Sequence, residues 1–365
     1  MKDTGIAVKT LGIFSRPTIP PEVAQEIAQL KLSKPKKEQV ANFVNSLETL
    51  RLAPDEQTDG SSAHKTFFLS NEFGFHNTLH YLATQHQDVF PVDKIRVALL
   101  VCESSFPSLL PELARFADVV IFVDINPTIL QANLHMLQCL RTAPNMEVCL
   151  ASYLDEKTNP FLNNPIKIKN LSSYNADGSR GESLKEQPMT PQLLEEMIIR
   201  YIATGFKQPV DGKASEYAYL QNEPRFIECV RGAHKLHFGF LCMNLFNIDH
   251  AQRFGKLLRD SNAVVTLCNV SNLFYLDGEQ TFDPLRVNPA WRSQSTLINC
   301  LKQFIDPQRT LLLHSLFEQL GSQRLTSHYA TRLINYVGEV TRNIKTHKDN
   351  AASLPVPPHG SKHRK

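Results

Sequence analysis

Short apolar runs alternate with helix-like stretches through the central part of the chain. The near-continuous apolar character of these runs is typical of strands that are covered on both faces of a sheet. The predicted strands cover residues 97–102, 119–123, 236–246, 263–268 and 310–316. Because helical stretches separate most of them, the pattern predicts an α/β fold with a doubly wound, mostly parallel sheet.

The segments between these runs space their apolar residues as helices do. Asn126 and Pro127 favour the start of one helix, and Asp249 is predicted to cap another. Residues 146–150 form one more short apolar run, which we predict to be an additional strand. The predicted helices cover residues 109–116, 128–140, 251–260 and 291–304.

The strand–helix pattern is missing from both ends of the chain and from one internal stretch. Residues 1–65 are predicted to form a helical N-terminal extension, and residues 66–343 a single Rossmann-like domain. Residues 151–235 are predicted to be an insertion on the surface or over a site, because their first part is rich in Asn, Ser, Gly and Pro. Within this stretch a helix is predicted to begin near residue 190. Residues 344–365 are basic and contain several prolines, which predicts a disordered tail.

The charge of the chain is concentrated in this tail. The formal net charge is +3, and residues 344–365 hold four lysines and one arginine against one aspartate, or +4, which leaves −1 for the rest. We therefore expect contact with nucleic acid, if any, through the tail alone. The seven cysteines form no CxxC pair, and no apolar run is long enough to span a bilayer. These features predict buried free thiols, no membrane span and a cytoplasmic protein.

The loop after the first predicted strand holds the first candidate residues. It reads Cys102-Glu103-Ser104-Ser105-Phe106-Pro107 and contains no glycine. Dinucleotide-binding folds place glycines at this turn so that the backbone can approach a pyrophosphate. The Cβ atoms of Ser104 and Ser105 disfavour such a cradle, whereas a ligand without phosphates tolerates them. The alternative is an ordinary strand-to-helix loop whose serines act as caps.

Polar residues also follow the later strands. Asp124 ends the second predicted strand, where a carboxylate can accept hydrogen bonds from both hydroxyls of a ribose; it could instead only cap the next helix. Asn244 and Asn247 follow the third strand and could reach the edge of an adenine.

A third group of polar and aromatic residues follows the fourth strand. Asn269, Asn272 and Tyr275 could orient and stack a planar or amine-bearing substrate. The alternative is a polar turn that leads into a buried aromatic pair.

Two histidine pairs have spacings that could support chemistry. His76 and His80 lie four residues apart on a predicted helix, but no third ligand is evident, so we expect no metal site. His234 and His237 precede the third strand and could act as a base or proton shuttle; the alternative is ordinary surface histidines.

This layout, with acids after the first two strands and an Asn-rich exit from the fourth, resembles the class I S-adenosylmethionine-dependent methyltransferase superfamily over residues 67–316. The resemblance implies that Glu103, Ser104 and Ser105 bind the methionine part of the cofactor. It implies that Asp124 with Ile125 binds the ribose and that Asn244 binds the adenine. The fourth-strand group would face the methyl acceptor, with Asn269 also near the cofactor.

We therefore expect an S-adenosylmethionine-binding protein, a methyltransferase whose acceptor the sequence does not identify. The alternative is a non-enzymatic interaction protein that keeps the fold and has lost the cofactor site. A dinucleotide-dependent oxidoreductase is a third hypothesis, which the glycine-free first loop argues against.

Overall fold

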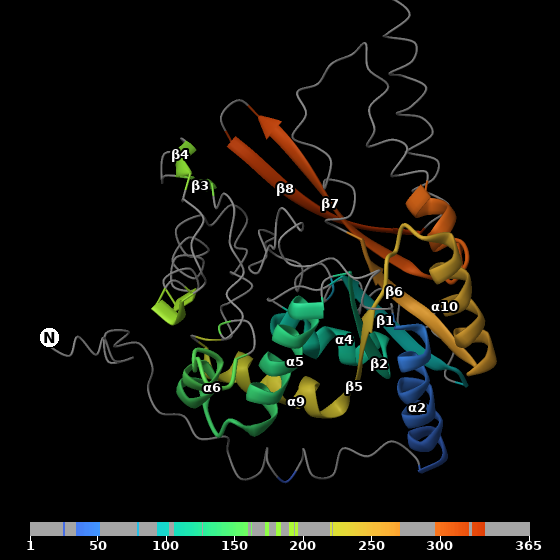
Figure 1. Ribbon diagram of the computed structural model, residues 1–365, viewed down its shortest axis with the longest axis horizontal. Coiled ribbons are helices and arrows are strands. Elements are labelled where there is room, and N and C mark those ends of the chain that lie inside the picture. Colours follow the sequence, from blue (N-terminus) through green and yellow to red (C-terminus); the bar gives the residue numbers. More distant parts are fainter. Residues whose placement is uncertain are drawn as a thin grey trace, which may run out of the picture.

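Figure 1 shows the computed structural model of the protein. The residues that the structure describes are 25, 34–51, 79, 93–101, 106–125, 127–159, 162, 172–174, 180–183, 190–192, 194–195, 220, 222–270, 296–320 and 323–332.

Six strands form one sheet in the order β5-β2-β1-β6-β7-β8 (Figure 1). The first five in this order run parallel, and β8 pairs antiparallel with β7. The sheet confirms the predicted doubly wound, mostly parallel α/β fold. The strands are β1 (Ile95–Val101), β2 (Val119–Asp124), β5 (His237–Cys242), β6 (Ala263–Asn269), β7 (Leu311–Leu320) and β8 (Gln323–Arg332).

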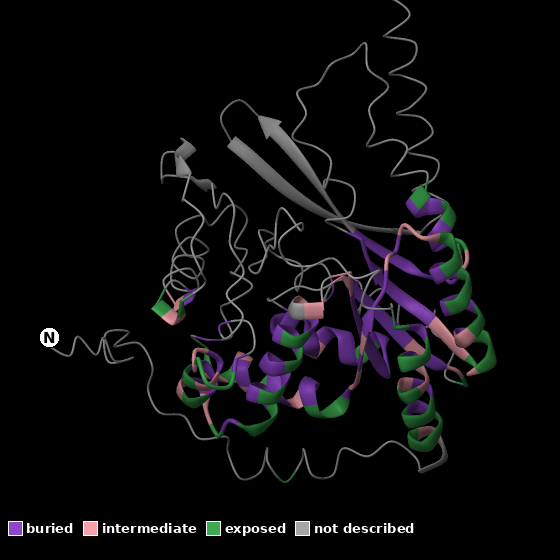
Figure 2. Ribbon diagram, in the orientation of Figure 1, coloured by how far each residue is buried: buried purple, intermediate pink, exposed green. Residues whose placement is uncertain are grey.

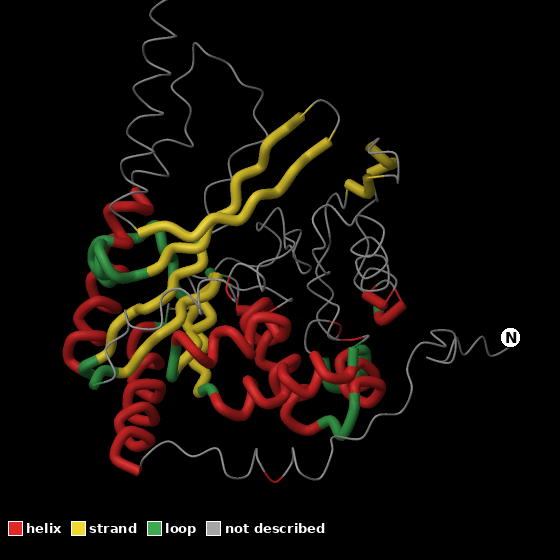
Figure 3. The backbone as a smooth tube through the Cα atoms, turned by 180° about the vertical axis from the view of Figure 1, so that it is seen from behind, coloured by secondary structure: helices red, strands yellow, loops and turns green. Residues whose placement is uncertain are grey.

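Helices cover both faces of the parallel strands, as Figures 1 and 3 show. One face carries η5 (Phe106–Leu109), α4 (Leu110–Phe116), α5 (Pro127–Thr142), α6 (Met146–Tyr153) and α9 (Glu223–Lys235). The other face carries α2 (Lys34–Ser46), η2 (Leu47–Leu50) and α10 (Ile248–Asp260). None of the helices in the described part of the chain is long and apolar enough to cross a membrane.

The central strands are buried on both faces, which explains their continuous apolar runs (Figure 2). Phe122 of β2 is fully buried, and its ring contacts three other phenylalanines. The ring centroids lie 4.7 Å from Phe106, 5.2 Å from Phe240 and 6.1 Å from Phe238. This aromatic cluster joins β2, β5 and η5 into one core.

Helix α9 lies inside the predicted insertion, residues 151–235, and was not itself predicted. Its apolar face packs against α4 so closely that a Cβ on Gly232 would lie 2.8 Å from the backbone of Leu110. The helix is therefore part of the layered core. The same stretch contains a small hairpin of β3 (Ser172–Tyr174) and β4 (Arg180–Ser183).

Two local predictions are wrong. Met146–Tyr153 is a helix rather than a strand, because Asn145 caps it by accepting from the backbone N–H of Val148 at 2.9 Å. The cap of α10 is Asn247, not Asp249: Oδ1 of Asn247 accepts from the N–H groups of Asp249 at 2.9 Å and His250 at 3.3 Å. The prediction of buried free thiols is confirmed for the described cysteines, Cys139, Cys149, Cys229, Cys242, Cys268 and Cys300.

The N-terminal helical segment, α2 with η2, packs directly on the edge strand β5. A Cβ on Gly239 of β5 would overlap Cδ1 of Leu47. Arg253 of α10 donates to the carbonyl oxygen of Thr49 at 2.8 Å. The described part of the N-terminal segment therefore packs as part of one helical layer of the fold.

We expect Gly239→Ala to lower the free energy of unfolding by about 1–3 kcal/mol, because the new methyl group overlaps the buried Leu47 side chain. Urea unfolding of Gly239→Ala, Leu47→Ala and the double variant measures this effect. Removing the Leu47 side chain makes room for the methyl group, so the double variant should be more stable than the sum of the single losses predicts. Strict additivity would contradict the close contact.

Candidate functional site

The carboxyl ends of the parallel strands meet at one edge of the sheet, and Asp124 lies there. It is the last residue of β2 and pairs with Cys242, the last residue of β5. The N–H of Met243 donates to the Asp124 carbonyl oxygen at 3.1 Å, which extends the pairing one residue further. Asp124 is partly exposed, although the four residues before it are buried. The end of a buried strand thus presents a carboxylate at the sheet edge.

Ile125 and Cys242 complete this end of the sheet. The Cys242 thiol donates to the Ile125 carbonyl oxygen at 3.5 Å. Burial, with the negative charge of Asp124, raises the pKa of Cys242 to about 11, and the positive charge of Arg51 opposes this shift. The thiol therefore stays protonated near neutral pH and is unsuited to be a nucleophile.

The two asparagines after β5 have different roles. Oδ1 of Asn244 accepts from the N–H of Phe246 at 2.9 Å, which fixes the side chain and leaves its Nδ2 group as a donor. Asn244 is half-buried next to the end of β5. The Asn247 oxygen likewise accepts from the first turn of α10, so Asn247 acts as a helix cap.

Asn269 lies further from Asp124. It ends β6 and pairs with Leu100 of β1 and Leu313 of β7, so β1 separates it from β2. The strand spacing and the two-residue offset put the backbones of Asp124 and Asn269 about 12 Å apart. Alternation puts both on the face that carries Phe122. Asn269 is only 2% exposed, so it lies beneath the surface at this edge.

The remaining site predictions lie outside the described residues. These are Glu103, Ser104, Ser105, Asn272 and Tyr275, together with the histidine pair His76 and His80. Of the predicted site residues that are described, the structure brings together Asp124, Ile125 and Asn244 at the ends of β2 and β5.

His234 and His237 lie at the opposite, amino-terminal edge of the sheet. The N–H of His237 donates to the carbonyl oxygen of Asp118, the residue before β2, at 3.0 Å. Burial lowers the pKa of His237, and the positive charges of Arg141 and Lys37 lower it further. Burial and Arg141 also lower the pKa of His234. Both rings are therefore mainly neutral near neutral pH and are remote from Asp124.

One residue of the N-terminal segment, Arg51, was not predicted to lie at this edge. Arg51 directly follows η2, and its charge acts on the Cys242 thiol. No sequence signal identified it, because its position depends on the packing of η2 against a strand almost two hundred residues later. Within the described ranges, no group of three or more His, Cys, Asp or Glu residues could hold a metal ion.

Comparisons with known proteins add little to this geometry. No protein-family model matches the sequence, and no curated protein matches it. Among solved structures, the chain is similar to the rRNA methyltransferase AviRa from Streptomyces viridochromogenes, with 14% identity and a TM-score of 0.34. The similarity covers 76% of this chain and 94% of that one. The fold assignment above rests on the strand order and register of the chain itself.

Proposed function

We propose that this protein binds S-adenosylmethionine at the carboxyl edge of its sheet and is a methyltransferase. The observation that carries the proposal is the position of Asp124 relative to the strand order. From β1 the chain adds β2 and β5 on one side and then β6 and β7 on the other, so the order reverses at β1. Ligands of open α/β sheets bind at such a reversal, and Asp124 ends the strand beside it.

The residues at this edge fit an adenosine-type ligand. The partly exposed Asp124 carboxylate is an acceptor suited to the two ribose hydroxyls, and the Nδ2 group of Asn244 is a donor suited to an adenine ring nitrogen. The glycine-free sequence Glu103-Ser104-Ser105, which follows β1 along the chain, suits the methionine part, which has no pyrophosphate.

When bound, S-adenosylmethionine supplies a methyl group on a positively charged sulfur. The chain's contribution in this proposal is to bind and orient the two reactants, because alignment alone removes much of the barrier of such a transfer. Asp124 and Asn244 fix the adenosine part. The fourth-strand group, Asn269, Asn272 and Tyr275, is proposed to face the methyl acceptor.

Asp124→Asn is expected to weaken the binding of S-adenosylmethionine and S-adenosylhomocysteine by about 10- to 100-fold, because hydrogen bonds to a charged acceptor contribute about 1.5–3 kcal/mol. Isothermal titration calorimetry of both ligands measures the loss. Asp249→Asn, at an exposed acid in the first turn of α10, is the matched control and should leave affinity unchanged. Equal affinities of Asp124→Asn and the wild type would remove Asp124 from the site.

The glycine-free first loop favours a second candidate, a non-enzymatic interaction protein built on the same fold. The same titration, with NAD as a third ligand, separates the two. A folded protein that binds none of the three ligands would contradict the first proposal and support the second. Binding of NAD alone would instead indicate an oxidoreductase.

A further inference from the structure

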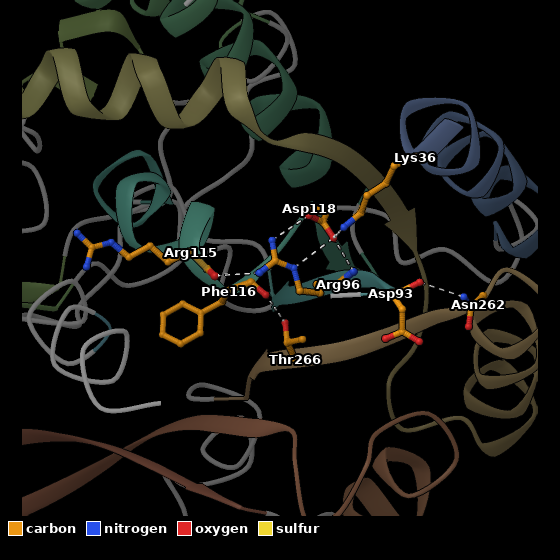
Figure 4. Close-up of polar contacts among 8 residues, drawn as sticks. All are labelled: Lys36, Asp93, Arg96, Arg115, Phe116, Asp118, Asn262 and Thr266. Atoms are coloured by element: carbon orange, nitrogen blue, oxygen red, sulfur yellow. Dashed lines mark hydrogen bonds and ion pairs between the residues drawn. The ribbon is translucent and has the colours of Figure 1, made fainter. Parts of the chain in front are cut away.

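The N-terminal segment, α2 with η2, runs along β5 from the amino ends of the parallel strands toward their carboxyl ends (Figure 1). At its start, Nζ of Lys36 lies 3.0 Å from Oδ2 of Asp118, at the amino edge (Figure 4). Further along, Leu47 packs on Gly239 in the middle of β5. The direction of the segment therefore carries its last described residue, Arg51, toward the carboxyl end of β5.

Arg51 is exposed at that end of the sheet. Its backbone N–H donates to the Glu48 carbonyl oxygen at 3.3 Å, which closes η2. Its side chain is 54% exposed, and its Nη1 lies 3.8 Å from Oε2 of the exposed Glu48. An exposed pair of this kind is weak, so the guanidinium is free to exchange it for a ligand.

The charges of Arg51 and Asp124 both act on Cys242. The negative charge of Asp124 raises the pKa of the Cys242 thiol, and the positive charge of Arg51 lowers it. Cys242 pairs with Asp124 at the ends of β5 and β2. The segment that ends at Arg51 packs on the other face of the sheet and approaches these strand ends from there. A ligand held by Asp124 therefore has β1 on one side and the end of β5, with Arg51, on the other.

We propose that Arg51 is a ligand-binding residue whose guanidinium lies against the purine base of the adenosine ligand held by Asp124. The inference rests on the proposed function, which assigns the ribose to Asp124 and the methionine part to the β1 side. The base then extends toward β5 and Asn244. A planar guanidinium stacks on an aromatic ring and has no acceptor of its own, so it suits a neutral purine better than a compact ammonium does.

The test compares two ligands that share the base and ribose but differ in the amino-acid part, adenosine and S-adenosylhomocysteine. Calorimetry should show that Arg51→Ala weakens both by the same factor, about 5- to 30-fold. Arg51→Lys should stay nearly as weak as Arg51→Ala, because the charge is kept and the plane is lost. The matched control is Arg309→Ala, because Arg309 is also exposed and pairs with Asp306 at 3.9 Å. Arg309 comes just before β7 and therefore lies at the amino ends of the strands, away from the carboxyl ends. This control should bind like the wild type.

Three results would overturn the inference. These are unchanged affinity in Arg51→Ala, a loss for S-adenosylhomocysteine but not for adenosine, and full recovery in Arg51→Lys. The second result would place Arg51 at the amino-acid carboxylate, and the third would reduce its role to charge. Each leaves the proposed function standing if Asp124→Asn still weakens both ligands. Failure of the wild type to bind either ligand would overturn the proposed function together with this inference.

Discussion

Asp118→Ala is expected to lower the free energy of unfolding by about 3–5 kcal/mol, since it removes one partner of a buried ion-pair cluster. The Asp118 side chain is 4% exposed and lies between Arg96 and Lys36 (Figure 4). It accepts from Arg96 three times, from the backbone N–H at 3.0 Å, Nε at 3.3 Å and Nη2 at 2.9 Å. Without it, the mostly buried Arg96 guanidinium loses its counter-charge.

The loss should depend on pH. Burial alone would raise the pKa of Asp118, but hydrogen bonds from Arg96 and Lys36 outweigh it and hold the pKa below its usual value near 4. A lowered pKa in the folded state stabilises the protein above the unfolded-state pKa, and this contribution is lost as the pH falls through the folded-state pKa. The stability difference between wild type and variant should therefore be constant above about pH 5 and shrink below about pH 4.

Urea unfolding of the wild type and Asp118→Ala between pH 3 and pH 8 measures both effects. Asp93→Ala is the control, because Asp93 is exposed and its described contact is made by its backbone carbonyl, which accepts from Asn262 at 3.3 Å. That substitution should change stability by less than about 0.5 kcal/mol. A difference for Asp118→Ala that persists undiminished at pH 3 would contradict the ionic explanation.

Arg225→Met is expected to have an effect of similar size, about 3–5 kcal/mol, at the contact between α4 and α9. Nη2 of Arg225 lies 2.9 Å from Oε2 of Glu112, and Nη1 lies 3.2 Å from Oε1 of the same carboxylate. Nη2 also donates to the Ser108 carbonyl oxygen at 2.6 Å. Glu112 is only 5% exposed, so the substitution leaves a buried charge without this bidentate partner.

A double-mutant cycle separates this cost from simple loss of packing. Glu112→Leu combined with Arg225→Met replaces the pair with apolar groups, and most of the stability lost in Arg225→Met should return. Lys256→Met is the control at an exposed pair with Asp260 and should cost less than about 1 kcal/mol. If Arg225→Met lowers the free energy of unfolding by no more than this control does, the ion pair between α4 and α9 contributes little to the stability of the fold.

The parallel strands could be predicted from the sequence because strands buried on both faces need unbroken apolar runs, which are easy to recognise. In β1 and β2, residues such as Leu99, Leu100, Ile121 and Phe122 are all fully buried, and only unbroken apolar runs satisfy such strands. The third strand was predicted too long, because Asn244 and Asn247 turn the chain soon after Cys242. The strand β8 was missed, since an edge strand needs no apolar run.

Short helices were harder to predict for a physical reason. Met146, Cys149, Leu150 and Tyr153 are buried at helical spacing, yet in eight residues this arrangement also reads as an apolar strand. The buried residues of α9 have helical spacing too, but a polar, irregular stretch precedes them. Its place in the core depends on the close approach of Gly232 to α4, which local sequence does not encode.

The candidate site was predictable only where it coincides with the end of a strand. Asp124 interrupts an apolar run, so its place at the sheet edge follows from the pattern. Arg51 has no such marker. It reaches the edge through the contact of Leu47 with Gly239, and pairings this distant in sequence leave no trace in a window of neighbouring residues.

The docking of the N-terminal segment also affects how the protein folds during synthesis. Thr49 and its partner Arg253 are 204 residues apart, so the ribosome makes the apolar face of α2 long before its docking surface. At about 5–20 residues per second this interval lasts roughly 10–40 s. During this interval the apolar side chains of α2 and η2 lack their native partners on β5 and α10; these are Val40, Phe43 and Leu47. We expect a chaperone to bind this exposed apolar segment.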